Sequence, residues 1–196
     1  MHNKLVIFDC FGVIMGEVAP TFLRKYLPED VAAPLKEKLF VPADLGLVTY
    51  DELLTNMAQA LGLDKEKMIP EWESLFVLQQ EIVPVIRRLR EKYDIALLSN
   101  APLGVVEGLI EKHGLCDLFD QTVISCNVKM AKPDEAIYKY CVSLFGKEYD
   151  EIYMVDDNII NLEHLPEIGI TPIHYSSVKD LEQLGVRSEE LGVVTD

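Results

Sequence analysis

The chain contains four short apolar runs and a fifth short run that mixes polar and apolar residues. These runs constrain its fold more than any other feature. Runs of three or four residues are too short for helices and predict strands of a sheet. The segments between them carry the apolar spacing of helices. Strands that alternate with helices predict an α/β fold with a doubly wound, parallel, five-stranded sheet. The proline of the last run predicts an edge position. The runs are residues 5–8, 95–98, 122–124, 152–155 and 171–174.

The first run ends at a carboxylate, Asp9, and a turn that contains Gly12 follows at once. Open α/β sheets bind their ligands outside the carboxyl ends of the strands, so Asp9 lies where a ligand would bind. Gly12 permits close approach of the backbone, which predicts that Asp9 faces a small anion ringed by main-chain N–H groups. An aspartate after a strand also commonly caps a turn, and Asp9 alone does not separate the two interpretations.

Three further strand ends carry polar side chains. Taken singly, each has an ordinary interpretation as a turn or a helix cap. Their recurrence after successive strands of one sheet predicts that they gather at one site. They are Ser99 and Asn100 after the second run, Lys132 after the third, and Asp156 and Asp157 after the fourth.

Between the first and second runs the chain contains no convincing strand. Thr49 and Glu52 form a capping box there, which predicts a helix that ends before Gly62. Helices are also predicted over residues 159–168 and from Ser177 onward. The loss of strands predicts two units, a core and an inserted helical unit, which comprise residues 1–16 with 81–196 and residues 17–80 respectively.

The composition narrows the choice of partners. A net charge of −15 over 196 residues argues against nucleic acid or an anionic membrane as a partner. No apolar run approaches ~18 residues, which predicts a soluble protein of the cytoplasm. The sequence is compatible with a monomer or a homodimer. The cysteines lack the spacing of metal ligands and predict buried free thiols; they are Cys10, Cys116, Cys126 and Cys141.

The order of the strand-end residues, Asp, then Ser-Asn, then Lys, then Asp-Asp, resembles the haloacid dehalogenase-like (HAD) superfamily of hydrolases. The four motifs span residues 5–161. The phrases at residues 131–138 and 155–158 are most similar to the bacterial branch related to α-glucose-1-phosphate phosphatase. The resemblance implies a Rossmann-like core, with the helical segment after the first strand as a small C1-type cap.

The resemblance also implies roles in phosphoryl transfer. Asp9 would be the nucleophile that forms an aspartyl-phosphate. The hydroxyl of Ser99 and the backbone N–H of Asn100 would bind the phosphate oxygens. Lys132 would place its ammonium on the phosphate and offset the carboxylates; Lys129 is a rival three residues upstream. We prefer Lys132 because Pro133 follows it at the predicted start of a helix.

A magnesium site is the second implication. Carboxylates that lie close together repel one another unless a cation lies between them, and oxygen ligands at a phosphate site favour Mg²⁺. By resemblance, Asp9, Asp157 and the backbone carbonyl of Phe11 ligate the ion. Asp156 is expected to hold waters of the metal site or Lys132. Asn161, one helical turn after Asp157, is placed to support the same site.

Phe11 departs from the pattern of HAD phosphatases, most of which carry a second aspartate here as general acid and base. An aromatic residue at this position resembles the 2-haloacid dehalogenases, whose halide leaving group needs no proton. Those enzymes need no metal and generally lack the acidic pair present here as Asp156 and Asp157. Without an acid at position 11, the leaving oxygen of a phosphate ester would depart as an anion, or would take its proton from water or from a residue of the cap.

The sequence thus predicts a Mg²⁺-dependent phosphatase that acts on a small phosphorylated metabolite, with a sugar phosphate first among the candidates. Two alternatives remain open. One is a hydrolase of the 2-haloacid dehalogenase type. The other is a HAD-fold binding protein that has retained the site and lost turnover.

Overall fold

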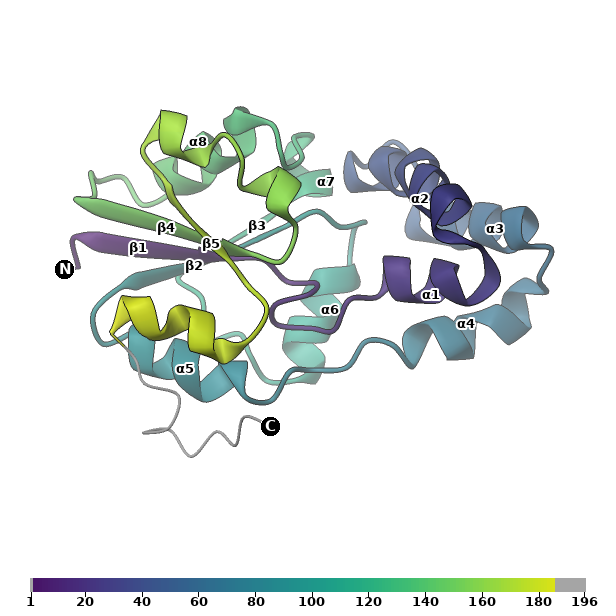
Figure 1. Cartoon of the computed structure of the whole chain (residues 1–196), viewed down its shortest axis with the longest axis horizontal. Coiled ribbons are helices and arrows are strands. Elements are labelled where there is room, and N and C mark those ends of the chain that lie inside the picture. Colours follow the sequence, from purple (N-terminus) through teal and green to yellow (C-terminus); the bar gives the residue numbers. More distant parts are fainter. Residues whose placement is uncertain (1, 186–196) are drawn as a thin grey trace.

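The centre of the molecule is a single parallel sheet of five strands (Figure 1). The computed structural model describes residues 2–185. The strand order is β3-β2-β1-β4-β5, so the chain winds outward from β1 in both directions, and Pro172 lies on an edge strand. The predicted doubly wound α/β fold is confirmed. The strands are β1 (Lys4–Phe8), β2 (Asp94–Ser99), β3 (Gln121–Ile124), β4 (Glu151–Asp156) and β5 (Thr171–His174).

The central strand β1 is covered on both faces. Val6 and Phe8 pack into the apolar cluster on one side of the sheet, and Leu5 and Ile7 into the cluster on the other. A strand buried on both faces is apolar at successive positions, which explains why its sequence does not alternate. One face is covered by α5 (Ile82–Leu89), α6 (Val105–Lys112) and the 3₁₀ helix η3 (Val178–Leu184), and the other by α8 (Glu135–Ser143) and the 3₁₀ helix η2 (Leu165–Ile168).

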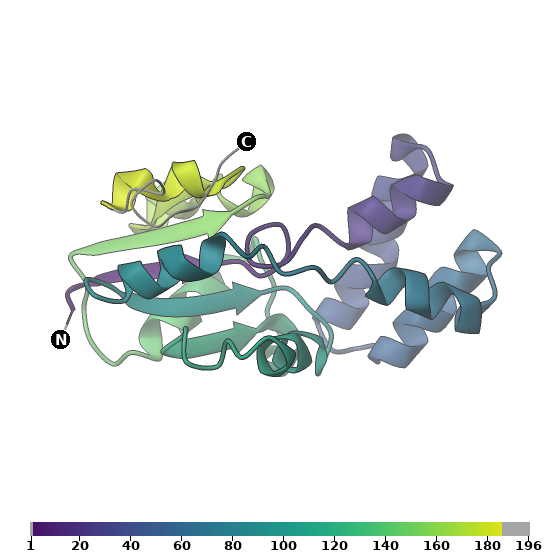
Figure 2. The ribbon, with the colours of Figure 1, turned by 90° about the horizontal axis from the view of Figure 1, so that it is seen from below.

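Of the five helices between β1 and β2 in the chain, the first four form a cluster beyond the carboxyl ends of the strands (Figures 1 and 2). Their apolar core contains Trp72, whose ring meets Phe22 and Phe76 edge-on at centroid distances of 5.4 and 5.7 Å. The indole N–H donates to the hydroxyl of Tyr50 at 2.7 Å, so the polar atom of this buried ring is satisfied. These helices are α1 (Ala19–Tyr26), α2 (Glu29–Asp44), α3 (Tyr50–Leu61) and α4 (Lys65–Glu73).

The local signals around α3 are confirmed. Thr49 and Glu52 form both bonds of the capping box, and Gly62 ends the helix in the left-handed conformation with φ +66°. Helix α8 begins at Glu135, two residues after the predicted start at Pro133, because Asp134 caps it and accepts a hydrogen bond from the Ala136 N–H.

Two predictions about the remaining chain were wrong, and one predicted helix is present as a 3₁₀ helix. The predicted helix over residues 159–168 is two 3₁₀ helices, η1 (Ile159–Asn161) and η2, because Pro166 has no N–H with which to continue an α-helical ladder. The helix predicted from Ser177 onward is present as the 3₁₀ helix η3, with Ser177 at its N-cap. Cys116 is exposed, whereas the other three cysteines are buried. No helix within residues 2–185 has the length and apolar character needed to cross a membrane.

Candidate active site

Asp9 lies directly beyond the end of β1 and is almost completely buried, with 7% of the residue exposed. Its backbone N–H continues the sheet by donating to the carbonyl of Val155 at 2.9 Å. The carboxylate oxygen Oδ1 accepts from the Cys10 N–H at 2.6 Å and from the Lys132 ammonium at 2.9 Å. The sheet and these two donors hold one oxygen of Asp9 in place.

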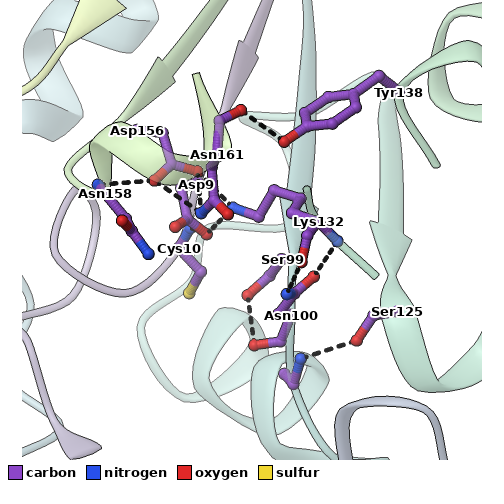
Figure 3. A network of polar contacts seen from close by, with 11 residues as sticks. Asp9, Cys10, Ser99, Asn100, Ser125, Lys132, Tyr138, Asp156, Asn158 and Asn161 are labelled. Atoms are coloured by element: carbon purple, nitrogen blue, oxygen red, sulfur yellow. Dashed lines mark hydrogen bonds and ion pairs between the residues drawn. The ribbon is translucent and has the colours of Figure 1, made fainter. Parts of the chain in front are cut away.

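Lys132 is the buried cation at the centre of the site (Figure 3). Its Nζ lies 2.9 Å from Asp9 Oδ1 and 2.6 Å from Asp156 Oδ2. Burial alone would lower the pKa of Lys132, but the charges of Asp156 and Asp9 outweigh it and leave that pKa raised. The side chain therefore stays cationic. Lys129 instead donates to the carbonyl of Gly46 at 2.9 Å and takes no part in this contact.

Asn100 holds the backbone of Lys132 in place. Its side-chain oxygen accepts from the Lys132 N–H and its side-chain nitrogen donates to the Lys132 carbonyl, both at 2.9 Å. The sequence predicted a role for the Asn100 backbone only, so this pair of bonds is an addition. Ser99, at the end of β2, is fully buried, and its Oγ lies 3.5 Å from the Asn100 carbonyl (Figure 3).

Asp156 is fully buried and both of its oxygens are occupied. Oδ1 accepts from the Asn158 N–H at 2.9 Å and from the Asn161 side chain at 3.0 Å. Oδ2 accepts from Lys132 at 2.6 Å and from the same Asn161 nitrogen at 3.1 Å. Asn161 is itself held by Tyr138, whose hydroxyl donates to its carbonyl at 2.7 Å. The arrangement suits a residue that positions Lys132.

Asp157 is packed against Gly12. Gly12 has φ +85°, and a Cβ atom at this position would lie 2.1 Å from Asp157 Oδ2. One oxygen each of Asp9, Asp156 and Asp157 lie within 4.8 Å of one another. Three carboxylates at this spacing form an all-oxygen donor set that fits a hard divalent cation.

The electrostatics of the site are those of crowded carboxylates. Burial, followed by the charge of Asp156, raises the pKa of Asp157 to about 6, with Lys132 opposing the rise. Burial also raises the pKa of Asp9, and Lys132 again opposes it. A single lysine therefore does not compensate the group, and a divalent cation would lower both pKa values.

A cavity of about 680 Å³ opens from these carboxylates toward helices α1–α4. Phe11 lies on its wall, with its ring centroid 6.0 Å from that of Phe76. The organic part of a ligand bound here would contact a mainly apolar wall. Its apolar lining includes Phe11, Phe40, Leu53, Trp72, Phe76 and Ile160.

The sequence did not predict that His174 and Asp44 would line the cavity. His174, which was assigned only a position beside a strand, lies on the cavity wall, and its Nε2 is 3.0 Å from the Asp157 carbonyl. Its position at the end of the fifth strand was the available signal, because β5 pairs it with Asp156. Asp44, the last residue of α2, had no local signal because it belongs to the segment without strands.

A doubly wound parallel sheet with a lysine and three carboxylates at its strand ends defines an enzyme of the Rossmann-like α/β class. The family model of the haloacid dehalogenase-like hydrolases matches residues 3–169. The chain therefore belongs to this hydrolase family, as the order of its motifs predicted.

Individual relatives are distant in sequence. A sesquiterpene phosphatase of Aspergillus oryzae is 21% identical over 175 residues, which are 87% of this chain and 89% of that protein. A HAD family enzyme of Bacteroides thetaiotaomicron, solved with magnesium and inorganic phosphate, is 24% identical with a TM-score of 0.72 and covers 92% of this chain and 98% of its own. L-2-haloacid dehalogenase of Xanthobacter autotrophicus, with chloropropionic acid covalently bound, is 18% identical with a TM-score of 0.64 and covers 93% and 82%.

Gly12→Ala is expected to damage the site. The new Cβ would need a left-handed backbone and would displace the Asp157 carboxylate, so we expect Mg²⁺ affinity to fall at least ~10-fold. The matched control is Gly16→Ala in the same loop, where the nearest atom to a new Cβ is 3.8 Å away. Titration calorimetry with Mg²⁺ measures both variants. Equal affinities in the two would contradict the packing argument.

Asp157→Asn is expected to stabilise the metal-free protein. Because the folded-state pKa of Asp157 is raised, its ionised form costs folding free energy above about pH 6, and this cost vanishes below the usual carboxyl range. We expect the metal-free variant to melt ~2–6 °C above wild type at pH 7.5 and the difference to shrink toward pH 4. Added Mg²⁺ should raise the melting temperature of wild type alone. A lower melting temperature for the metal-free variant would contradict this account.

Proposed function

We propose that this chain is a Mg²⁺-dependent phosphatase that hydrolyses the phosphate monoester of a small molecule through an aspartyl-phosphate. The observation that carries the proposal is the contact of Lys132 with Asp9 and Asp156, with Asp157 beside them. The relatives agree with it, since one is a phosphatase and another was solved with magnesium and phosphate.

The proposed chemistry starts at Asp9. One of its oxygens attacks the phosphorus atom, the bond from phosphorus to the leaving oxygen breaks, and water then releases phosphate from the aspartate. Lys132, the Ser99 hydroxyl and the backbone N–H of Asn100 bind the phosphate oxygens, and Gly12 lets the backbone approach them. When bound, Mg²⁺ offsets the negative charge shared by the phosphate and the carboxylates.

For the metal, we propose Asp9, Asp157 and the backbone carbonyl of Phe11 as ligands. Asp156 is the weaker candidate because hydrogen bonds already occupy both of its oxygens. The side chain of Asp157 has no hydrogen-bond donor from another side chain within residues 2–185, which leaves it available to an ion.

The helical unit of residues 17–80 is proposed as the cap that encloses the organic part of the substrate, over a core of residues 1–16 and 81–196. A sugar phosphate was the prediction from sequence. The aromatic side chains of Phe40 and Trp72 on the cavity wall favour an apolar organic group instead, because burying a hydroxyl against them costs free energy. The name of the sesquiterpene phosphatase relative points the same way.

Asp9→Asn is expected to lower phosphate release by more than about a thousandfold, because an amide cannot act as the nucleophile. The variant should keep the circular dichroism spectrum of wild type. Wild-type activity should be lost in excess EDTA and restored by Mg²⁺. Turnover by Asp9→Asn within tenfold of wild type would refute the mechanism. Halide release from a 2-haloacid in EDTA would instead support a dehalogenase.

A series of alkyl phosphates tests the proposed apolar substrate. Each methylene buried against the cavity wall contributes about 0.8 kcal/mol, so kcat/KM should rise by at least ~30-fold from ethyl to octyl phosphate. Glucose 1-phosphate and glucose 6-phosphate are the comparison substrates. A sugar phosphate that outperforms octyl phosphate tenfold would restore the original prediction. Binding of phosphate and Mg²⁺ without turnover of any substrate would identify a binding protein.

A further inference from the structure

Asp44 is a carboxylate that faces the cavity from the helical unit. It is the last residue of α2, partly buried, and it lines the cavity together with Asp9 and Phe11. Within residues 2–185, no group donates a hydrogen bond to its carboxylate and no cation forms an ion pair with it. An acidic side chain in a partly apolar cavity without a structural partner is free to interact with a ligand.

The backbone of Asp44 is tied to the strand ends of the core. The Ser125 hydroxyl, fully buried at the start of α7 (Ser125–Val128), donates to the Asp44 carbonyl at 2.6 Å. The same hydroxyl oxygen accepts from the Ala101 N–H at 3.0 Å (Figure 3). Ala101 follows Asn100, whose side chain holds the backbone of Lys132. Asp44 is thus fixed relative to the residues proposed to bind phosphate.

Burial and the nearby charges together bring the pKa of the Asp44 carboxyl group close to neutral pH. Burial raises its pKa to about 7, and Lys36 on its own helix and Lys132 from the core oppose that rise. From α7, the Cys126 thiol faces it, and Lys129 is bonded to the nearby Gly46 carbonyl. A carboxyl group with this pKa carries its proton in a substantial fraction of molecules at pH 7, as a general acid requires.

We propose that Asp44 is the general acid and base that the phenylalanine at position 11 cannot provide. The inference rests on the proposed phosphatase activity. As the bond from phosphorus to the leaving oxygen breaks and Asp9 bonds to phosphorus, the Asp44 carboxyl donates its proton to that oxygen, which leaves as an alcohol. The Asp44 carboxylate then accepts a proton from the water that attacks the aspartyl-phosphate, which restores both aspartates and releases phosphate.

The experiment compares leaving groups that need a proton with one that does not. In wild type, the slope of log kcat/KM against leaving-group pKa should be shallow. Asp44→Asn should lower kcat/KM for butyl phosphate by ~10²–10⁴-fold and leave 4-nitrophenyl phosphate within about fivefold, which steepens the slope. The matched control is Glu37→Gln, an exposed carboxylate on the same helix and the same cavity wall, for which no change in slope is expected.

The pH profile is a second readout that a merely structural role would not move. Because the acid must be protonated, wild-type activity on butyl phosphate should fall as pH rises through about 7, and this decline should be absent in Asp44→Asn. Melting curves check the fold, and Asp44→Ser takes the place of Asp44→Asn if the latter does not fold.

The outcomes separate the inference from the proposed function. Equal losses on both substrates, or no loss on butyl phosphate, would overturn the role of Asp44. So would a steep slope in wild type, since a leaving group would then depart without a positioned acid. Absence of phosphate release from either substrate by wild type, with Mg²⁺ present, would overturn the phosphatase assignment itself.

Discussion

The candidate site depends on one buried ammonium. Lys132 joins the ends of β1 and β4 by contacting Asp9 and Asp156, and a buried charge of this kind is tolerated only when it is paired and hydrogen-bonded. Asn100 holds the lysine backbone and Asn161 holds Asp156. Removing one charged partner of this pair would leave the other charge buried and uncompensated, at a cost of about 3–5 kcal/mol.

The remaining negative charge at the site has a different consequence. Burial, followed by the charge of Asp156, raises the pKa of Asp157, and the single cation Lys132 does not offset the rise. A metal-free protein carries this repulsion as a loss of stability, and a bound divalent cation would remove it. The three neighbouring carboxylates are therefore the cause both of the repulsion and of the capacity to bind a cation.

The two units of the chain divide the proposed work. The ends of the strands carry the groups proposed to act on phosphate, and the helical unit supplies most of the apolar wall around Trp72 and Phe40. Asp44 lies where the two meet, since its backbone is bonded to the core through Ser125 while its side chain lines the cavity.

The sequence by itself determined the sheet and the chemical character of its strand ends. Short apolar runs bounded by Asp9, Ser99 and Asp156 are local patterns, and burial on both faces of a parallel sheet produces them directly. Only the tertiary structure decided that hydrogen bonds occupy both oxygens of Asp156, that within residues 2–185 no other side chain donates to Asp157, and that Asp44 faces the cavity. Those facts depend on contacts between distant segments; the bond from Ser125 to Asp44 spans 81 residues, and no local pattern encodes it.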